Sequence, residues 1–177
     1  MDRIVVCDKT LKQNEKLLSL SFREKIELCR LVDRLEVDWI ELPAIQNQKV
    51  DSLLIKSVAT AVRQTGIAVP VQLSQESVSV TWNALKEARQ PRLQVVAPVS
   101  SVQMEYLYHM KPALLQDRVT EIIRECKACT SDVEFIADDA SRGSLDFIRR
   151  LIFGDLHLYI SVIFKRSVTV QMIRRQV

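Results

Sequence analysis

At 177 residues the chain is long enough for one well-buried core and too short for two comfortable domains. Apolar residues make up 47% of the sequence and charged residues 27%, which is typical of a soluble globular domain. The net charge of +3 is small, both signs are interspersed, and no apolar run reaches the roughly 18 residues that a bilayer requires. We therefore expect no nucleic-acid partner and no membrane partner. The charged start without a signal-peptide pattern predicts a cytoplasmic protein.

The cysteine and glycine contents argue against several kinds of site. Cys126 and Cys129 have the spacing of a redox motif, but no second such pair completes a zinc site, so we expect all four cysteines to be reduced thiols. Only three glycines occur, and loops that cradle phosphate need glycine for close backbone approach. A Rossmann or P-loop function is therefore disfavoured.

Strand and helix patterns alternate along the chain. Short apolar runs rich in β-branched residues predict strands at 4–7, 37–43, 67–73, 93–97 and 132–137. Apolar spacings of three and four predict helices at 22–35, 53–65, 76–89, 102–129 and 144–153. We expect Gly66 to close the second helix as its C-cap and Pro112 to break the fourth, since proline lacks a backbone donor. His109 is then a surface residue of that fourth helix.

The alternation predicts stacked βαβ units and a parallel sheet. Two architectures satisfy it: a flavodoxin-like doubly wound sheet, or part of a TIM barrel, which normally needs about 250 residues. Residues 155–164 fit a sixth strand, and the pattern of residues 165–177 assigns no element.

Four segments carry a resemblance to a known family. Asp8-Lys9-Thr10-Leu11-Lys12-Gln13-Asn14-Glu15-Lys16 is similar to the first-strand motif Asp-x-Thr-Leu-Arg-Asp-Gly-x-Gln of the isopropylmalate synthase, homocitrate synthase and hydroxymethylglutaryl-CoA lyase superfamily. Val37–Glu41, Ser100–Tyr106 and Val133–Arg142 resemble its second-, fourth- and fifth-strand motifs, in the same order. The resemblance covers roughly residues 4–152, the first five of eight βα units.

The resemblance favours the barrel over the flavodoxin-like sheet. It implies an α/β fold, a partial TIM (β/α) barrel of five to six βα units of parallel sheet. We expect residues 1–153 to form this part of the barrel and residues 154–177 to be a divergent C-terminal tail with a possible sixth strand.

The family's chemistry is a Claisen-type condensation that uses acetyl-CoA as co-substrate. A divalent metal, Mg²⁺ or Mn²⁺, polarises the 2-oxo acid, and a cation stabilises the developing charge. The motif's metal-binding Asp matches Gln13, its Arg matches Lys12, and the fourth-strand His matches Gln103. The family's His-x-His is absent. An amide oxygen is a poorer ligand for a hard cation than a carboxylate, so we expect the chain to be inactive alone.

The site residues that the resemblance implies lie where the predicted strands end. Lys12 and Glu41 are the candidate catalytic residues, and Gln13 is the candidate metal ligand in place of the family Asp. Asp8 and Thr10 either line a substrate pocket or stabilise the turn that follows the first strand. Asp138 and Asp139 form a candidate substrate-binding carboxylate pair, and one of them can instead cap the next helix.

Two functional hypotheses remain open. In the first, the chain is a member or subunit of the isopropylmalate synthase-like acyltransferases. Its exposed strand edges then predict a homo-oligomer or a second chain that completes the barrel. In the second, it is a degenerate, non-catalytic relative that acts as a binding or partner subunit.

Overall fold

The computed structural model describes residues 4–12, 19–153, 159–164 and 168–172. It divides into two compact units, and each is described by itself. Unit 1 comprises residues 1–71 and 79–93, and unit 2 comprises residues 72–78 and 94–177. Within the described ranges, no helix is both long enough and apolar enough to cross a membrane.

Strands and helices alternate as the sequence predicts. In chain order the elements are β1 (Cys7–Asp8), η1 (Thr10–Lys12), α1 (Phe22–Arg34), β2 (Trp39–Glu41), α2 (Gln48–Ala61), β3 (Gly66–Val71), α3 (Gln75–Leu85), β4 (Pro91–Pro98), α4 (Ser101–Tyr106), α5 (Pro112–Cys129), β5 (Val133–Asp138), η2 (Ala140–Arg142), α6 (Leu145–Phe153), β6 (Tyr159–Phe164) and β7 (Val168–Met172). The strand order is β1-β2-β3 in unit 1 and β4-β5-β6-β7 in unit 2, with the first three residues of β4 assigned to unit 1. A flavodoxin-like sheet would place β1 between β2 and β3. The fold is therefore the predicted α/β partial TIM barrel.

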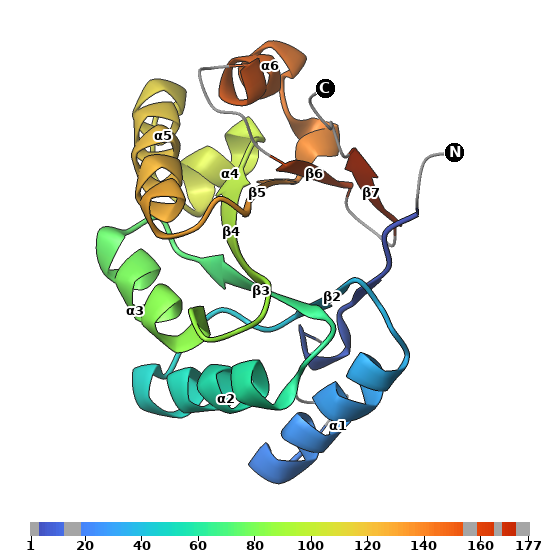
Figure 1. The fold of residues 1–177 in the computed structure, drawn as a ribbon. Helices are drawn as coiled ribbons and strands as arrows, with labels where there is room; N and C mark the ends of the chain where they lie inside the picture. Colours follow the sequence, from blue (N-terminus) through green and yellow to red (C-terminus); the bar gives the residue numbers. More distant parts are fainter. Residues whose placement is uncertain (1–3, 13–18, 154–158, 165–167, 173–177) are drawn as a thin grey trace. The chain divides into compact units, whose positions relative to one another are not determined.

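In unit 1 the parallel register aligns the carboxyl ends of neighbouring strands. Cys7 pairs with Trp39 and Asp8 with Ile40, and β2 in turn pairs along β3, which is buried throughout. Helices α1 and α2 pack against each other beside this sheet (Figure 1). The register therefore brings the segment that follows β1 next to the last residue of β2.

Polar side chains fix the ends of the helices in unit 1. Ser21 and Glu24 form a capping box at the start of α1, because each side chain accepts a hydrogen bond from the other residue's backbone N–H. Asn47 caps α2 by accepting from the backbone N–H groups of Lys49 and Val50. This cap starts α2 at Gln48, five residues before the start that apolar spacing predicts.

The predicted end of α2 is also wrong. The helix ends at Ala61, because residues 63–65 turn away to donate their backbone N–H groups to the carboxylate of Asp33 on α1. Asp33 is only 8% exposed. A buried carboxylate that accepts three N–H bonds holds this segment out of the helix.

Gly66 is the first residue of β3, not the C-cap of α2. A Cβ at this position would lie 2.5 Å from Cζ3 of Trp39, whose ring packs against the glycine backbone. The guanidinium of Arg92 also lies over the indole of Trp39, 3.5 Å from the ring centroid. Glycine is therefore required here by close packing.

Unit 2 contains the predicted sixth strand and one strand that the sequence left unassigned. Tyr159–Phe164 (β6) pairs in parallel with β5, and Val168–Met172 (β7) pairs antiparallel with β6. A short connection between two strands permits only antiparallel pairing, because a parallel crossover needs a dozen or more residues. The chain thus leaves the βα repeat after β6.

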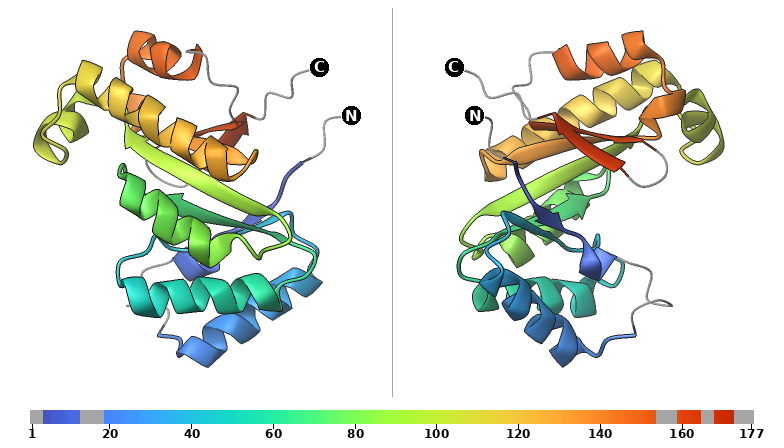
Figure 2. Two further views of the ribbon diagram at one scale, coloured as in Figure 1. Left: turned by 60° about the vertical axis from the view of Figure 1, so that its left-hand side comes forward. Right: turned by 90° about the vertical axis from the view of Figure 1, so that its right-hand side faces the viewer.

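Helix α5 provides the main apolar face of unit 2. It runs alongside β5 (Figure 2) and buries five side chains on one helical face: Leu115, Val119, Ile122, Ile123 and Cys126. Pro112 occupies the first turn of α5, so the predicted break between two helices is present. His109 lies in the segment between these helices with φ of 49°, and its placement on a helix surface was wrong.

Candidate functional site

Glu41 is a buried carboxylate held by two lysines at the carboxyl end of β2. Its side chain is 2% exposed, and Oε1 lies 3.1 Å from Nζ of Lys9 while Oε2 lies 2.9 Å from Nζ of Lys12. The two lysine side chains keep about a third of their surface in solvent, at 32% and 31%. A buried charge needs such partners, since desolvation without them would be costly. The structure therefore joins the two candidate catalytic residues, Lys12 and Glu41, directly.

Cys7 completes this group from the neighbouring strand. Its thiol donates to Oε1 of Glu41 at 3.5 Å, the same oxygen that Lys9 contacts. The side chain is partly exposed. We call these four residues, Cys7, Lys9, Lys12 and Glu41, the Glu41 cluster.

Asp8 and Thr10 shape the turn that delivers the lysines. The carboxylate of Asp8 accepts from the backbone N–H of Thr10 at 3.2 Å and from its hydroxyl at 2.8 Å. This pattern starts the short helix η1, at whose end Lys12 lies. The turn-stabilising role is thus observed, and a role in a substrate pocket stays a prediction.

In unit 2, Asp139 is committed to structural partners. The residue is 2% exposed, and its side chain accepts a hydrogen bond from the hydroxyl of Ser100 at 2.7 Å. Nε of Arg142 donates to both oxygens of the same carboxylate. Its backbone has a φ of 56°, in the left-handed region. It stands at the start of η2 without capping it through its side chain.

Asp138 faces a different set of partners. Nε2 of Gln103 donates to its Oδ2 at 3.0 Å, and the backbone N–H of Asp139 donates to its Oδ1. Burial and the charge of Asp138 raise the pKa of Tyr108. The two neighbouring carboxylates therefore bind different groups. A substrate-binding role for either one remains a prediction.

The residues that the structure describes do not fit a divalent metal. No group of three or more His, Cys, Asp or Glu side chains is arranged to hold an ion within those ranges. The buried carboxylate nearest the family's site, Glu41, is already neutralised by ammonium groups that would repel a cation. Gln13, the candidate metal ligand, lies outside the described residues.

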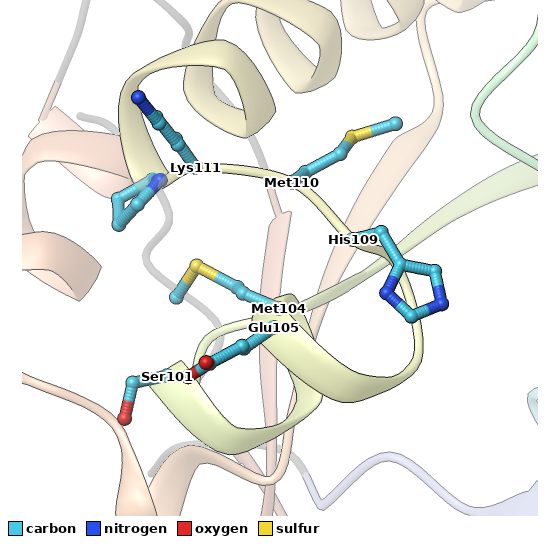
Figure 3. Close-up of a pocket in the computed structure, with 7 residues that line it drawn as sticks. Ser101, Met104, Glu105, His109, Met110 and Lys111 are labelled. Atoms are coloured by element: carbon cyan, nitrogen blue, oxygen red, sulfur yellow. The ribbon is translucent and has the colours of Figure 1, made fainter.

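A pocket of about 420 Å³ lies at the junction of α4 and α5. Figure 3 shows Ser101, Met104 and Glu105 of α4 on one side and His109 with Met110 of the following segment on the other. The sequence singled out none of these five as a site residue.

The cysteines of unit 2 do not form a reactive pair. Burial raises the pKa of the Cys126 thiol to about 12, with smaller contributions from Cys129 and Glu125. Burial and the charge of Glu125 also raise the pKa of Cys129. All four cysteines are free thiols, as predicted.

The sequence did not identify two members of the Glu41 cluster, Cys7 and Lys9, as site residues. Lys9 occupies a variable position of the family motif and Cys7 reads as an ordinary strand residue, so neither suggested chemistry. A parallel pairing of Val37–Glu41 with the first strand would have indicated them, because neighbouring parallel strands bring their last residues side by side.

Comparisons with known proteins agree with the motifs. The profile of the HMGL-like family matches residues 3–172. The chain is 30% identical over 154 residues to the 2-isopropylmalate synthase of Carboxydothermus hydrogenoformans, which is 86% of this chain and 30% of that protein. It is 28% identical over 163 residues to that of Pelotomaculum thermopropionicum, covering 91% and 32%, and 29% identical over 165 residues to that of Shouchella clausii, covering 92% and 32%. The chain spans about a third of the length of these relatives.

Proposed function

The chain belongs to the HMGL-like family of condensing enzymes, and from this premise we propose that it binds a small 2-oxo acid at the Glu41 cluster but does not catalyse acyl transfer alone. The relatives are named 2-isopropylmalate synthase, and the corresponding activity is an acyl-CoA-dependent condensation of a 2-oxo acid. Binding and turnover are separate claims, and they rest on different features.

The observation that carries the binding claim is the pair of lysines on Glu41. Two ammonium groups surround one carboxylate, so the cluster holds more positive than negative charge. Both lysine side chains keep about a third of their surface in solvent, and a lysine ammonium group has three N–H donors. A carboxylate ligand is the chemical class that such charge-assisted donors bind best.

Inactivity follows from the groups that surround the reaction centre. Condensation needs the developing alkoxide to be stabilised and the 2-oxo acid to be polarised. The described residues supply cations for the first requirement and no metal site for the second. A lysine ammonium also lacks the planar fork with which the family's arginine binds.

Titration calorimetry with a panel of 2-oxo acids, from pyruvate upwards in chain length, tests the binding claim. We expect Lys12→Gln to weaken binding about tenfold or more, since it removes a charged donor from the cluster. Lys56→Gln is the matched control, because Lys56 is an exposed lysine of α2 in the same unit. Equal affinities of both variants and the unmodified chain would contradict the assignment.

Mass spectrometry of reactions with acetyl-CoA, Mg²⁺ or Mn²⁺ and the same acids tests inactivity. No condensed product is expected from the purified chain. A product that disappears when a chelator is added would show that the chain assembles a working metal site, and the proposal of inactivity would be wrong.

We further propose a partner, either a second copy or a second polypeptide that supplies the remaining ligands. The strand order places β1 at an edge of the sheet, and soluble proteins usually cover such edges. Native mass spectrometry of the purified chain is expected to show an oligomer under the first alternative. Acyltransferase activity that appears only when a second, separately purified polypeptide is added would support the other.

A further inference from the structure

We propose that Cys7 and Lys9 form an acyl-accepting pair, in which Cys7 takes an acyl group from a thioester and passes it to the amine of Lys9. The product is an N-acylated Lys9, a modification of one member of the Glu41 cluster. The step requires no 2-oxo acid and no metal, so it stands or falls separately from the proposed function.

The geometry centres on one oxygen atom. The thiol of Cys7 donates to Oε1 of Glu41 at 3.5 Å, and Nζ of Lys9 lies 3.1 Å from the same Oε1. The separation of sulfur and nitrogen therefore cannot exceed the sum of these two distances. Lys12 contacts the other oxygen, Oε2, so Lys9 is the lysine that shares a carboxylate oxygen with the thiol.

Glu41 is the group placed to accept the thiol proton in the first step. A nucleophile needs a proton acceptor within hydrogen-bond reach, and the thiol already donates to this carboxylate. Sγ attacks the thioester carbonyl carbon, a new S–C bond forms, and the S–C bond of the donor breaks. The departing thiolate takes the proton that Glu41 received, so the exchange is balanced without an oxidant.

The second step moves the acyl group from sulfur to nitrogen. Lys9 loses its ammonium proton to solvent, and Nζ attacks the carbonyl carbon of the Cys7 thioester. The N–C bond forms, the S–C bond breaks, and the Cys7 thiolate takes the second amine proton. Proximity makes this transfer effectively intramolecular, and an amide is more stable than a thioester.

The other thiols of the described chain lack this setting. Burial raises the pKa of Cys29 and of Cys126 to about 12, so neither is an accessible nucleophile. Cys129 is partly exposed like Cys7, but in the described part of the chain its thiol shares no carboxylate with a lysine ammonium group, as Cys7 does through Glu41. Acylation is therefore expected at Cys7 before any of the three.

The test is incubation of the purified chain with acetyl-CoA, and in parallel with S-acetyl-N-acetylcysteamine as a thioester without the nucleotide. Peptide mapping is expected to place one acetyl group on Lys9. In Cys7→Ser, acetylation of Lys9 is expected to slow about tenfold or more, because direct attack loses the intramolecular advantage. In Lys9→Arg, the acetyl group is expected to remain on Cys7 as a thioester that hydroxylamine removes.

Two controls keep the result interpretable. Cys129→Ser removes a thiol of similar exposure and is expected to leave Lys9 acetylation unchanged. Circular dichroism of each variant excludes unfolding as the cause of a change. Equal rates of Lys9 acetylation in Cys7→Ser and the unmodified chain, or acetylation of Lys12 as fast as that of Lys9, would overturn the proposal.

Discussion

The carboxylate of Asp33 on α1 accepts three backbone hydrogen bonds from the segment before β3. The variant Asp33→Asn measures how much these bonds contribute to the free energy of unfolding. Oδ1 accepts from the N–H groups of Gln64 and Thr65 at 3.0 and 2.8 Å, and Oδ2 accepts from Arg63 at 3.0 Å. The asparagine oxygen can replace Oδ1, and its NH₂ group then faces the N–H of Arg63. One charged hydrogen bond is lost and two become neutral.

These changes give the expected magnitude. A hydrogen bond to a charged group contributes about 1.5–3 kcal/mol and one between neutral groups about 0.5–1.5 kcal/mol. Losing one charged bond and weakening two others therefore costs about 4–5 kcal/mol of the free energy of unfolding. Urea unfolding followed by far-ultraviolet circular dichroism measures this difference. Glu27→Gln on the same helix is the control, because Glu27 is 52% exposed and a surface change is expected to stay within about 0.5 kcal/mol.

The effect of Asp33 depends on pH in a defined direction. Burial raises the pKa of Asp33, but the hydrogen bonds from residues 63–65 outweigh it and lower the pKa overall. The stabilisation is therefore complete above the unfolded-state pKa of about 3.9 and is lost as the pH falls through the folded-state value. Equal urea midpoints for Asp33→Asn and the unmodified chain near neutral pH would refute this reasoning. So would a difference that persists in strong acid.

Two further predictions concern stability. Gly66→Ala is expected to lower the free energy of unfolding by about 1–3 kcal/mol, because the new methyl group would collide with the ring of Trp39. Thermal unfolding measures this loss, and an unchanged midpoint would contradict the close packing. Asp139→Ala is expected to cost about 2 kcal/mol, because the buried hydroxyl of Ser100 would lose its acceptor. Ser100→Ala in the same background should then cost less than it does alone, and additive costs in this double-mutant cycle would argue against the bond.

The fold was predictable because its signal is repeated along the chain. Four of the five predicted strands coincide with observed ones, whereas the run at 4–7 overlaps its strand, β1, only at Cys7. The order of four short motifs selected the barrel over the doubly wound sheet. The end of α2 was not predictable, because the carboxylate that shapes it lies on another helix, at Asp33. The same holds for Gly66, whose position in β3 depends on the indole of Trp39 packed against it.

The site was predictable in part. Lys12 and Glu41 were chosen from separate motifs, and the structure joins them at 2.9 Å. Lys9 was missed because the turn that brings it back depends on side-chain hydrogen bonds of Asp8. Adjacent positions in the sequence suggested a carboxylate pair at 138–139, but the left-handed backbone of Asp139 sends its carboxylate to other partners.

The indole that packs between Gly66 and Arg92 also gives the chain an optical reporter. Both tryptophans, Trp39 and Trp82, belong to unit 1. Their emission therefore follows the unfolding of that unit alone, whereas helices of both units contribute to the circular dichroism. A solvent-induced red shift that precedes or trails the loss of ellipticity would separate the two units within one titration.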